Sequence, residues 1–383
     1  MSHISVSDLT LTYGDTTAVK ALDLDIAEGE ALVLLGQSGC GKTSTMRCIA
    51  GLETPDTGTI SVGDRTLFDS RLGVNRPPHK RNIGMVFQSY AIWPHMTVFE
   101  NVAFSLQMKR MNKAEIKRKV SDTLEIVGLD GFADRGASML SGGQMQRVAL
   151  ARSLAMEPSV MLLDEPLSNL DARLRQRLRG DLRELQTRLG LTSIYVTHDQ
   201  EEALALADRI AMMQFGRIVQ IGTPSEIYAR PLSASIADFL GVTNNIPVTA
   251  LDSSMVQLVD SDVRLRVDGF EYADALRACI RAEDIVIGDD AASSSENVVL
   301  GEIVTTEFHG ATASYRVRVK GGVELNVLGT KHHATGLRPG DDVSLGIPSA
   351  AIQVIPLDVP GIDTAAAGDV VPESTAAMGV TRT

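Results

Sequence analysis

The chain has 383 residues, of which 44% are hydrophobic and 22% charged, a balance typical of a soluble globular protein with two or three domains. Its net charge of −12 argues against a nucleic acid bound over a broad surface. No apolar run approaches the ~20 residues that span a bilayer, and the first residues lack the pattern of a signal peptide, so any membrane role would depend on a partner protein. The three cysteines, Cys40, Cys48 and Cys279, have no metal-like spacing and suit a reducing cytosol.

The chain begins with short stretches of alternating apolar and polar residues, which predict strands near 4–12, 19–27 and 31–35. Tyr13 follows the first strand in a chain with only 4% aromatic residues. Its ring could stack on a nucleobase, a contact of about 1–3 kcal/mol. A tyrosine packed at the end of a strand explains the position equally well.

The third strand leads into Gly36–Thr43, GQSGCGKT, and then into a stretch that can be helical. A strand, a glycine-rich loop and a helix in this order are typical of a phosphate site, because loop N–H groups and the helix N-terminus converge on one anion. Lys42 would bring its charge to the β- and γ-phosphates of a nucleotide, and Thr43 its hydroxyl to Mg2+. We expect Cys40 to be an inert spacer. The alternative is a glycine turn without a ligand. The predicted binding residues are Gly36, Gln37, Ser38, Gly39, Cys40, Gly41, Lys42 and Thr43.

Residues 51–88 are rich in turns, with strand candidates at 58–62 and 82–87. The second candidate is followed directly by Gln88. A polar residue at the end of a buried strand is where α/β proteins place ligand contacts. Taken alone, a surface glutamine is the simpler interpretation.

Residues 90–158 are predicted to form a helical insertion, with one helix near 99–110 and another capped by Asn112 and stopped by Gly128. A third helix follows Leu140-Ser141-Gly142-Gly143-Gln144 and runs to about Met156. Ser141 is its predicted N-cap, and the two glycines would leave the first helical N–H groups open to a second anion. An ordinary helix start is the alternative. The candidate contacts to the anion are Ser141, Gly142, Gly143 and Gln144.

Residues 160–163 form an apolar strand that ends in Asp164 and Glu165. An acidic residue at the tip of a buried parallel strand is the usual Mg2+ partner of a phosphate loop, and the second carboxylate could polarise an attacking water. Solvated loop carboxylates are the alternative. The loop 168–171, SNLD, ends in Asp171 and precedes a helix up to Gly190. The run of arginines on this helix is interpreted as a solvated face: Arg173, Arg175, Arg177, Arg179, Arg183 and Arg188.

The next apolar strand, 193–196, leads to His198. A histidine here could contact a γ-phosphate, although a structural histidine is the commoner case. A helix over 201–207 and a hairpin over 209–221 complete this half of the chain.

After Gly241 the pattern changes to β-alternation, which predicts strands within 255–268, 279–287, 300–308, 313–319 and 323–328. Short strands separated by glycine turns indicate a small β-barrel or sandwich. Residues 358–383 are predicted to be a disordered tail. The predicted domains are therefore 1–240, 241–357 and the tail.

The order of these motifs resembles that of the ATP-binding subunits of ABC transporters over about residues 3–235. The resemblance implies an α/β P-loop ATPase with a helical subdomain. Tyr13 matches the adenine-stacking aromatic, Gly36–Thr43 the Walker A loop, and Leu140–Gln144 the LSGGQ signature. Gln88 matches the Q-loop and Asp171 the D-loop. The remaining matches are Asp164 with the Walker B aspartate, Glu165 with the catalytic glutamate and His198 with the switch histidine.

The β-rich remainder resembles the OB-like TOBE-type regulatory domain, whose Arg-Pro-Glu-Asp turn is similar to Arg281–Asp284 here, with Ala at the proline position. The combination is similar to importers of sugars, ferric ion, polyamines or phosphonates. It implies a translocase-type ATPase, with ATP and Mg2+ bound between two copies in a head-to-tail homodimer. Thr43, Gln88 and Asp164 would hold the metal.

The resemblance further implies permease subunits as partners, with a solute-binding protein acting indirectly, at the cytoplasmic face of the membrane. The segment 89–97 would help to dock the permease. Two other classes remain as alternatives: a soluble ABC-type ATPase of translation or DNA repair, and a regulatory binding protein that uses ATP as a switch.

Overall fold

The computed structural model describes residues 2–288, 291, 295–330 and 336–359, which form two compact units, one ending at Ile227 and the other starting at Tyr228. Of the predicted disordered tail, residues 360–383 lie outside the described part. Within the described residues, no helix has both the length and the apolar composition that a membrane span requires.

The first unit is built on a six-stranded sheet with the order β11-β10-β3-β9-β8-β7. All neighbours pair in parallel except β11, which forms a hairpin with β10. Every residue of β3, β8 and β9 is buried, because both faces of the sheet are covered. The strands are β3 (Ala31–Leu35), β7 (Ile83–Val86), β8 (Val160–Asp164), β9 (Ser193–Thr197), β10 (Arg209–Gln214) and β11 (Arg217–Gly222).

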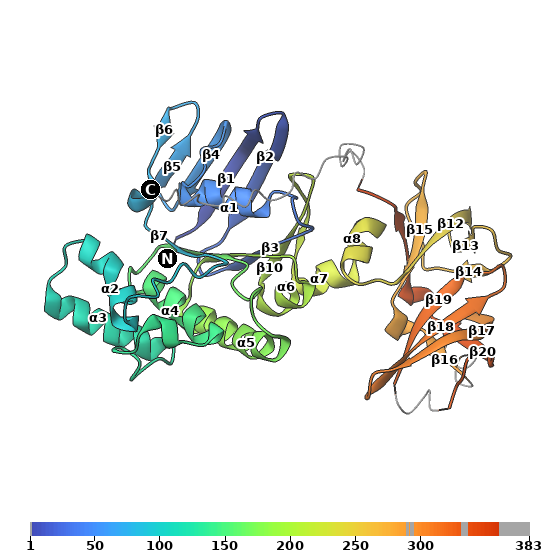
Figure 1. Cartoon of the computed structure of the whole chain (residues 1–383). Helices are drawn as coiled ribbons and strands as arrows, with labels where there is room; N and C mark the ends of the chain where they lie inside the picture. Colours follow the sequence, from blue (N-terminus) through green and yellow to red (C-terminus); the bar gives the residue numbers. More distant parts are fainter. Residues whose placement is uncertain (1, 289–290, 292–294, 331–335, 360–383) are drawn as a thin grey trace, which may run out of the picture. The chain divides into compact units, whose positions relative to one another are not determined.

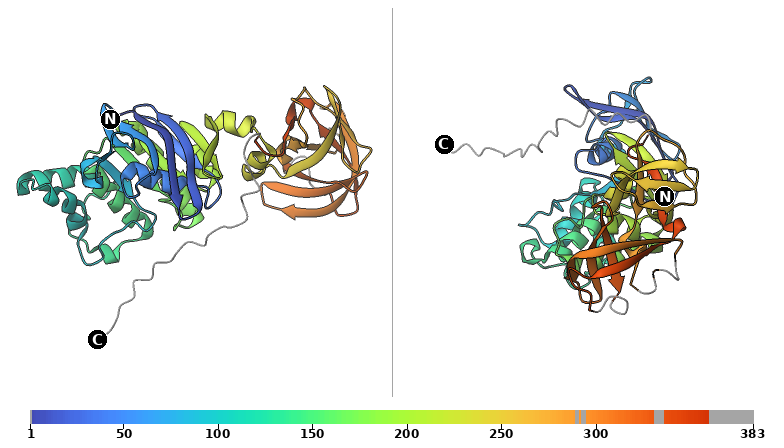
Figure 2. Two further views of the ribbon diagram at one scale, coloured as in Figure 1. Left: turned by 90° about the horizontal axis from the view of Figure 1, so that it is seen from above. Right: turned by 90° about the vertical axis from the view of Figure 1, so that its right-hand side faces the viewer.

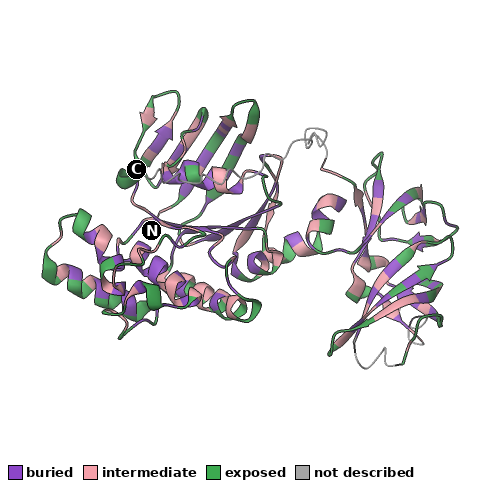
Figure 3. Cartoon of the chain, viewed as in Figure 1, coloured by how far each residue is buried: buried purple, intermediate pink, exposed green. Residues whose placement is uncertain are grey.

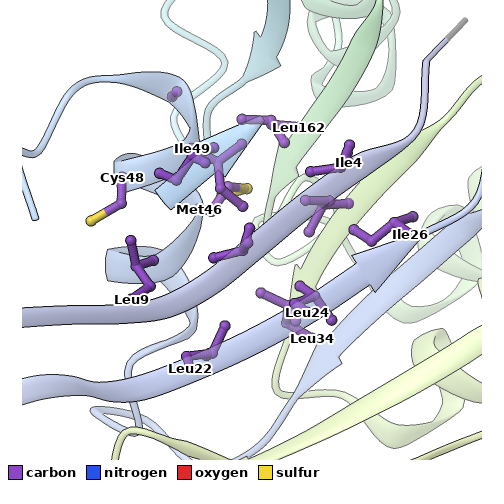
Figure 4. Packing of buried hydrophobic residues seen from close by; sticks show 14 of the residues in the cluster. Ile4, Leu9, Leu22, Leu24, Ile26, Leu34, Met46, Cys48, Ile49 and Leu162 are labelled. Carbon is purple, nitrogen blue, oxygen red and sulfur yellow. The ribbon is translucent and has the colours of Figure 1, made fainter. Parts of the chain in front are cut away.

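An antiparallel sheet with the order β2-β1-β4-β5-β6 lies above the parallel sheet in Figure 1. Helix α1 (Lys42–Ala50) lies between the two sheets, and Figure 4 shows its Met46 and Ile49 among apolar side chains of both. This shared core anchors the helix that follows the glycine loop. The strands are β1 (Ile4–Tyr13), β2 (Thr16–Ile26), β4 (Thr57–Val62), β5 (Arg65–Asp69) and β6 (Val74–Asn75). The sequence pattern misses β5 and β6, because both are short and lie among turns.

The helical insertion consists of α2 (Val98–Met108), α3 (Lys113–Ile126) and α4 (Gly142–Leu154). Asn112 caps α3 as predicted, with its side chain accepting from the N–H of Glu115 at 2.8 Å. Helix α5 (Ala172–Leu189) ends at Gly190, also as predicted. Helix α6 (Gln200–Leu206) follows β9. The outward faces of these helices are exposed, whereas the strands beneath are buried (Figure 3).

The interpretation of the α5 arginines as a solvated face is wrong for three of them. Arg175, Arg179 and Arg183 recur every four residues and therefore share one side of the helix. They pair with carboxylates on and beside α6, with N–O distances of 2.5–3.3 Å. The carboxylates belong to Asp199, Glu201 and Asp208. Arg173 and Arg177 face solvent as predicted.

The second unit is all-β apart from short helical segments, as predicted, and its yellow-to-red strands can be followed in Figure 2. Two five-stranded antiparallel sheets share one apolar core. The first contains β12 (Asn244–Asp252), β13 (Met255–Leu258), β14 (Arg264–Arg266), β15 (Leu276–Ile280) and β21 (Ile352–Pro356). The second contains β16 (Val286–Ile287), β17 (Asn297–Phe308), β18 (Thr312–Val319), β19 (Glu324–Thr330) and β20 (Asp342–Ile347).

The chain enters the second unit through α7 (Pro224–Ala229) and α8 (Ala234–Phe239). Ala234 and Ala237 of α8 pack on Cys279 of β15, so α8 belongs to the second unit. The second unit therefore begins before Gly241, the residue after which the sequence changes to β-alternation. In the Arg281–Asp284 turn, the guanidinium of Arg281 lies 3.4 Å from the ring centre of Tyr228.

Candidate nucleotide-binding site

The predicted site residues follow four neighbouring strands of the parallel sheet. The glycine loop follows β3, and His198 follows β9. Asp164 ends β8 and Glu165 comes directly after it, while Gln88 lies just beyond β7. Because these strands are parallel and adjacent, their carboxyl ends meet at one edge of the sheet. Four segments that are distant in sequence therefore contribute to one surface.

Close packing requires glycine in the loop at two positions. A Cβ on Gly36 would lie 2.3 Å from the carbonyl oxygen of Met213, and one on Gly41 would lie 2.3 Å from that of Ala18. Gly41 also has a φ of 102°, which other residues rarely adopt. Gly41 is the N-cap of α1. Because it has no side chain, no side chain of the N-cap covers the first N–H groups of the helix. A phosphate is the kind of group that such N–H groups bind.

The Lys42 ammonium is held inside the loop. The residue is 5% exposed, and its Nζ donates to the carbonyl oxygens of Gly36 and Gln37, both at 2.8 Å. Cys40 lies beside it, and burial raises the pKa of the Cys40 thiol although Lys42 acts in the opposite direction. A buried thiol with a raised pKa is a poor nucleophile, which supports the interpretation of Cys40 as a spacer.

Thr43 and Asp164 form the oxygen-rich part of the site. The Thr43 hydroxyl donates to Oδ1 of Asp164 at 3.1 Å. Asp164 is 7% exposed, and burial raises the pKa of its carboxyl while the Thr43 hydrogen bond lowers it. No cluster of three or more metal-binding side chains occurs in the described part of the chain. One carboxylate and one hydroxyl nevertheless fit Mg2+, which commonly takes most of its other ligands from water and phosphate.

Glu165 is held between Gln88 and His198. Its Oε2 accepts from Nε2 of Gln88 at 3.1 Å, and its Oε1 lies 3.0 Å from Nδ1 of His198. The Glu165 backbone has a φ of 41°, an unfavourable conformation for a residue with a Cβ. The His198 side chain is 58% exposed. Glutamate, amide and imidazole thus face solvent at the same edge, where they can orient a water molecule.

Two residues of the SNLD loop support Gln88, and the sequence did not single out either one for this role. Ser168 Oγ lies 3.4 Å from the Gln88 side chain, and Nδ2 of Asn169 donates to the Gln88 carbonyl oxygen at 2.9 Å. Asp171 caps α5 by accepting from the N–H of Leu174 at 3.0 Å. These contacts join the loop to the edge of the sheet at which Gln88 and Glu165 lie.

Tyr13 lies at the end of β1 and is 45% exposed. Burial of the other part of its side chain raises the pKa of its hydroxyl, and a hydrogen bond with Ser44 of α1 opposes this shift. Tyr13 is therefore close to the helix that begins with Lys42 and is partly exposed, which is compatible with a stacking role.

The residues 141–144 lie apart from this group. The Ser141 hydroxyl accepts from the Gln144 N–H at 3.4 Å, and the Gln144 side chain accepts from the Ser141 N–H at 2.9 Å, a capping box. Ser141 is therefore the N-cap that the sequence predicts, and its hydroxyl covers the N–H of Gln144. Gly143 has a packing role as well, because a Cβ there would lie 3.2 Å from Leu178 of α5. Among the described residues, no hydrogen bond joins the residues 141–144 to the glycine loop.

Comparisons with known proteins show which families the chain is similar to. The family described as "ABC transporter" matches residues 19–168, and the family described as "TOBE domain" matches residues 278–355. The Fe(3+) ions import ATP-binding protein of Agrobacterium fabrum is 42% identical over 348 residues, which is 90% of this chain and 95% of the relative. The spermidine/putrescine import ATP-binding protein of Rubrobacter xylanophilus is 43% identical, over 89% of this chain and 90% of the relative.

A third relative and one solved structure extend the comparison. The trehalose/maltose import ATP-binding protein of Thermococcus litoralis is 40% identical over 90% of this chain and 95% of the relative. The structure of cbiO1 from Clostridium perfringens, described as part of the ABC transporter complex cbiONQ, is 32% identical with a TM-score of 0.54. It covers 59% of this chain and 90% of its own.

Proposed function

The chain belongs to the ABC transporter family of import ATP-binding proteins, and we propose that it hydrolyses ATP to drive the uptake of a solute through membrane permease subunits. The observation that carries this proposal is the double contact of Glu165, 3.1 Å from Gln88 and 3.0 Å from His198, beside the Thr43–Asp164 pair. A glutamate placed in this way can orient and deprotonate an attacking water.

Lys42 and the N–H groups of the glycine loop bind the phosphates in this proposal, and Tyr13 stacks on the adenine. Phosphoryl transfer depends mainly on positioning and charge. Glu165 acts on the water, and His198 contacts the γ-phosphate.

Thr43, Asp164 and Gln88 would hold Mg2+. Their hydroxyl, carboxylate and amide oxygens are the donors that this ion prefers. When bound, the ion neutralises part of the negative charge on the phosphate oxygens.

Two copies of the chain are proposed to complete each site. Ser141 and Gly143 begin a helix that has no acidic residue in its first turn, so its N-terminus can receive an anion. Since these residues make no hydrogen bond to the glycine loop of their own chain among the described residues, we assign them to the nucleotide of a partner copy in a head-to-tail dimer. We also assign Gly142, Gln144 and Asp171 to this nucleotide-binding set.

The test is the variant Glu165→Gln. It keeps the size of the side chain and removes the base, so ATP should still bind while turnover falls by roughly 10²–10⁴-fold. Phosphate release and nucleotide binding are measured on the full chain, with Glu184→Gln, an exposed residue on α5, as the matched control. Turnover at the wild-type rate in Glu165→Gln would sink the proposal.

The permease is proposed to dock on the segment 89–97, at the cytoplasmic face of the membrane. Trp93 is partly exposed there and packs against Phe104 of α2, with the ring centres 4.5 Å apart and the ring planes tilted by 47°. A partly exposed aromatic on a supported loop is a typical anchor for a partner helix. A Trp93→Asp chain should no longer co-purify with its permease; an unchanged yield would count against this surface.

The solute is proposed to be one of the classes that the relatives' names state. Relatives named for ferric ion, polyamine, sugar and sulfate import lie at 40–44% identity, so identity does not single out one class. A soluble ATPase of translation or DNA repair is disfavoured, because the chain is similar to proteins named for import over nearly the whole length of those relatives. The permease and a solute-binding protein should together stimulate the ATPase when reconstituted with it.

A further inference from the structure

One of the α5 arginines that contact α6 connects two loops of the candidate site. Helix α5 begins after the SNLD loop, and α6 begins directly after His198. This arginine, Arg175, contacts the residues at the beginning of both helices. Its Nη1 donates to Oδ2 of Asp199 at 3.1 Å, and its Nη2 donates to the carbonyl oxygen of Leu170 at 3.2 Å.

We propose that Arg175 is a positioning residue that fixes His198 relative to the SNLD loop by holding Asp199 and Leu170 with one guanidinium group. The proposal rests on the proposed ATPase function and adds a residue to it. Arg175 touches neither Glu165 nor the glycine loop in the contacts of the described residues, so it acts through the backbone on either side.

Asp199 transmits this constraint to the histidine. Its Oδ1 accepts from the N–H groups of Glu201 and Glu202, at 2.8 and 3.2 Å, and so caps α6. Its Oδ2 is left for Arg175. Both carboxylate oxygens are therefore fixed, one by the helix and one by the arginine, and His198 is the residue directly before them.

The residue on the other side of His198 is fixed as well. The Thr197 hydroxyl donates to Oε2 of Glu202 at 2.8 Å and accepts from the Asp199 N–H at 3.0 Å. Glu202 is 3% exposed, and its Oε1 lies 3.9 Å from Nε of Arg175. His198 itself is exposed, and its side chain makes a polar contact only with Glu165 among the described residues, so its place is set by these two neighbours.

The other two arginines of this side provide an internal comparison. Arg179 pairs with Glu201, whose side chain is 77% exposed, and such surface pairs contribute little. Arg183 pairs with Asp208 at the far end of α6. Of these three arginines, only Arg175 forms a partly buried ion pair, with Asp199, and also donates to the SNLD loop.

The test uses the full chain with Arg175→Gln and the conservative Arg175→Lys. Because a displacement of about 1 Å can cost on the order of 100-fold in rate, we expect Arg175→Gln to lower kcat by roughly 10-fold to 100-fold. KM for ATP and binding of a fluorescent ATP analogue should change less than about threefold, since the phosphate loop is not involved. Arg175→Lys should recover part of the loss. Arg179→Gln and Arg173→Gln should behave as wild type.

A second variant and a double variant make the outcome decisive. Asp199→Asn keeps a good N-cap and removes only the charge that Arg175 contacts, so it should reproduce the loss of kcat even if Arg175→Gln does not fold. On a His198→Ala background, Arg175→Gln should cost no further activity beyond about twofold, because the two residues act through one group.

Two results would overturn the proposal: wild-type kcat in both Arg175→Gln and Asp199→Asn, or a full additional loss on the His198→Ala background. The failure of the proposed function would look different. In that case the wild-type chain would not hydrolyse ATP, or Glu165→Gln would retain turnover.

Discussion

Two helices of the first unit begin with glycine-rich turns, and they differ in what their own chain provides. The turn before α1 has a glycine N-cap, a buried lysine and a hydroxyl bonded to Asp164 from another strand. The turn before α4 is capped by its own Ser141 and Gln144. In the proposed function, the first turn binds the phosphates of its own chain's nucleotide and the second binds those of a partner copy. This division of roles fits the absence, among the described residues, of a hydrogen bond from the residues 141–144 to the glycine loop.

Of the changes to these two turns, removing the charge from the first should have the largest effect. In Lys42→Ala the loop loses its ammonium group, and a hydrogen bond to a charged group is worth about 1.5–3 kcal/mol, so we expect ATP to bind roughly 10-fold to 150-fold more weakly. Equilibrium binding on the full chain measures this. Lys117→Ala, at an exposed position of α3, is the control. Unchanged affinity in Lys42→Ala would place the nucleotide elsewhere.

Altering the second turn should affect turnover and leave ATP binding intact. Ser141→Asp keeps a favourable N-cap and places a negative charge where the partner's phosphate would lie. We expect the melting temperature and the ATP affinity of Ser141→Asp to stay near those of the wild type, while turnover falls by about 10-fold or more. Ser141→Ala is the complementary control, since losing the cap costs about 0.5–2 kcal/mol of stability without adding a charge. Equal turnover in Ser141→Asp and wild type would contradict the shared site.

Mixing the two variants tests the same comparison directly. In a mixed dimer of Lys42→Ala and Ser141→Asp chains, one site carries both changes and the other carries neither. Random pairing of equal amounts should therefore restore about a quarter of the wild-type activity if the two sites work independently. A mixture as inactive as its components would argue against two shared sites.

The residues at the carboxyl ends of the parallel strands in the first unit could be predicted from the sequence, because buried strands are marked by apolar runs. Apolar runs such as 160–163 mark buried parallel strands, and the residue after such a run lies at the edge where ligands bind. The positions of Asp164, Glu165 and His198 follow from this rule alone. Their mutual distances do not, because the order of the strands in the sheet is not contained in any local pattern.

The role of Arg175 could not be predicted for the same reason. Its partner Asp199 is 24 residues away and belongs to another helix, and a helical run of arginines looks alike whether it faces water or a neighbouring helix. A usable signal does exist: the paired arginines recur every fourth residue, and the stretch 199–208 is rich in acidic residues. The packing of Gly143 against Leu178 could not be predicted either. A glycine at the start of a helix suits an anion site as well as a close contact, and the sequence pattern is the same for both.

The smallest effect is expected within the first turn itself, at Cys40. The thiol lies 3.8 Å from the Lys42 ammonium, and its pKa is raised by burial, so at neutral pH it is an uncharged neighbour of the charge that binds phosphate. Cys40→Ser has a similar size, and we expect ATP affinity and turnover within about threefold of wild type and a loss of stability of about 1 kcal/mol. Binding and thermal unfolding measure both quantities. A loss as large as that of Lys42→Ala would mean that the sulfur takes part in holding the ammonium, and the turn would then depend on two side chains instead of one.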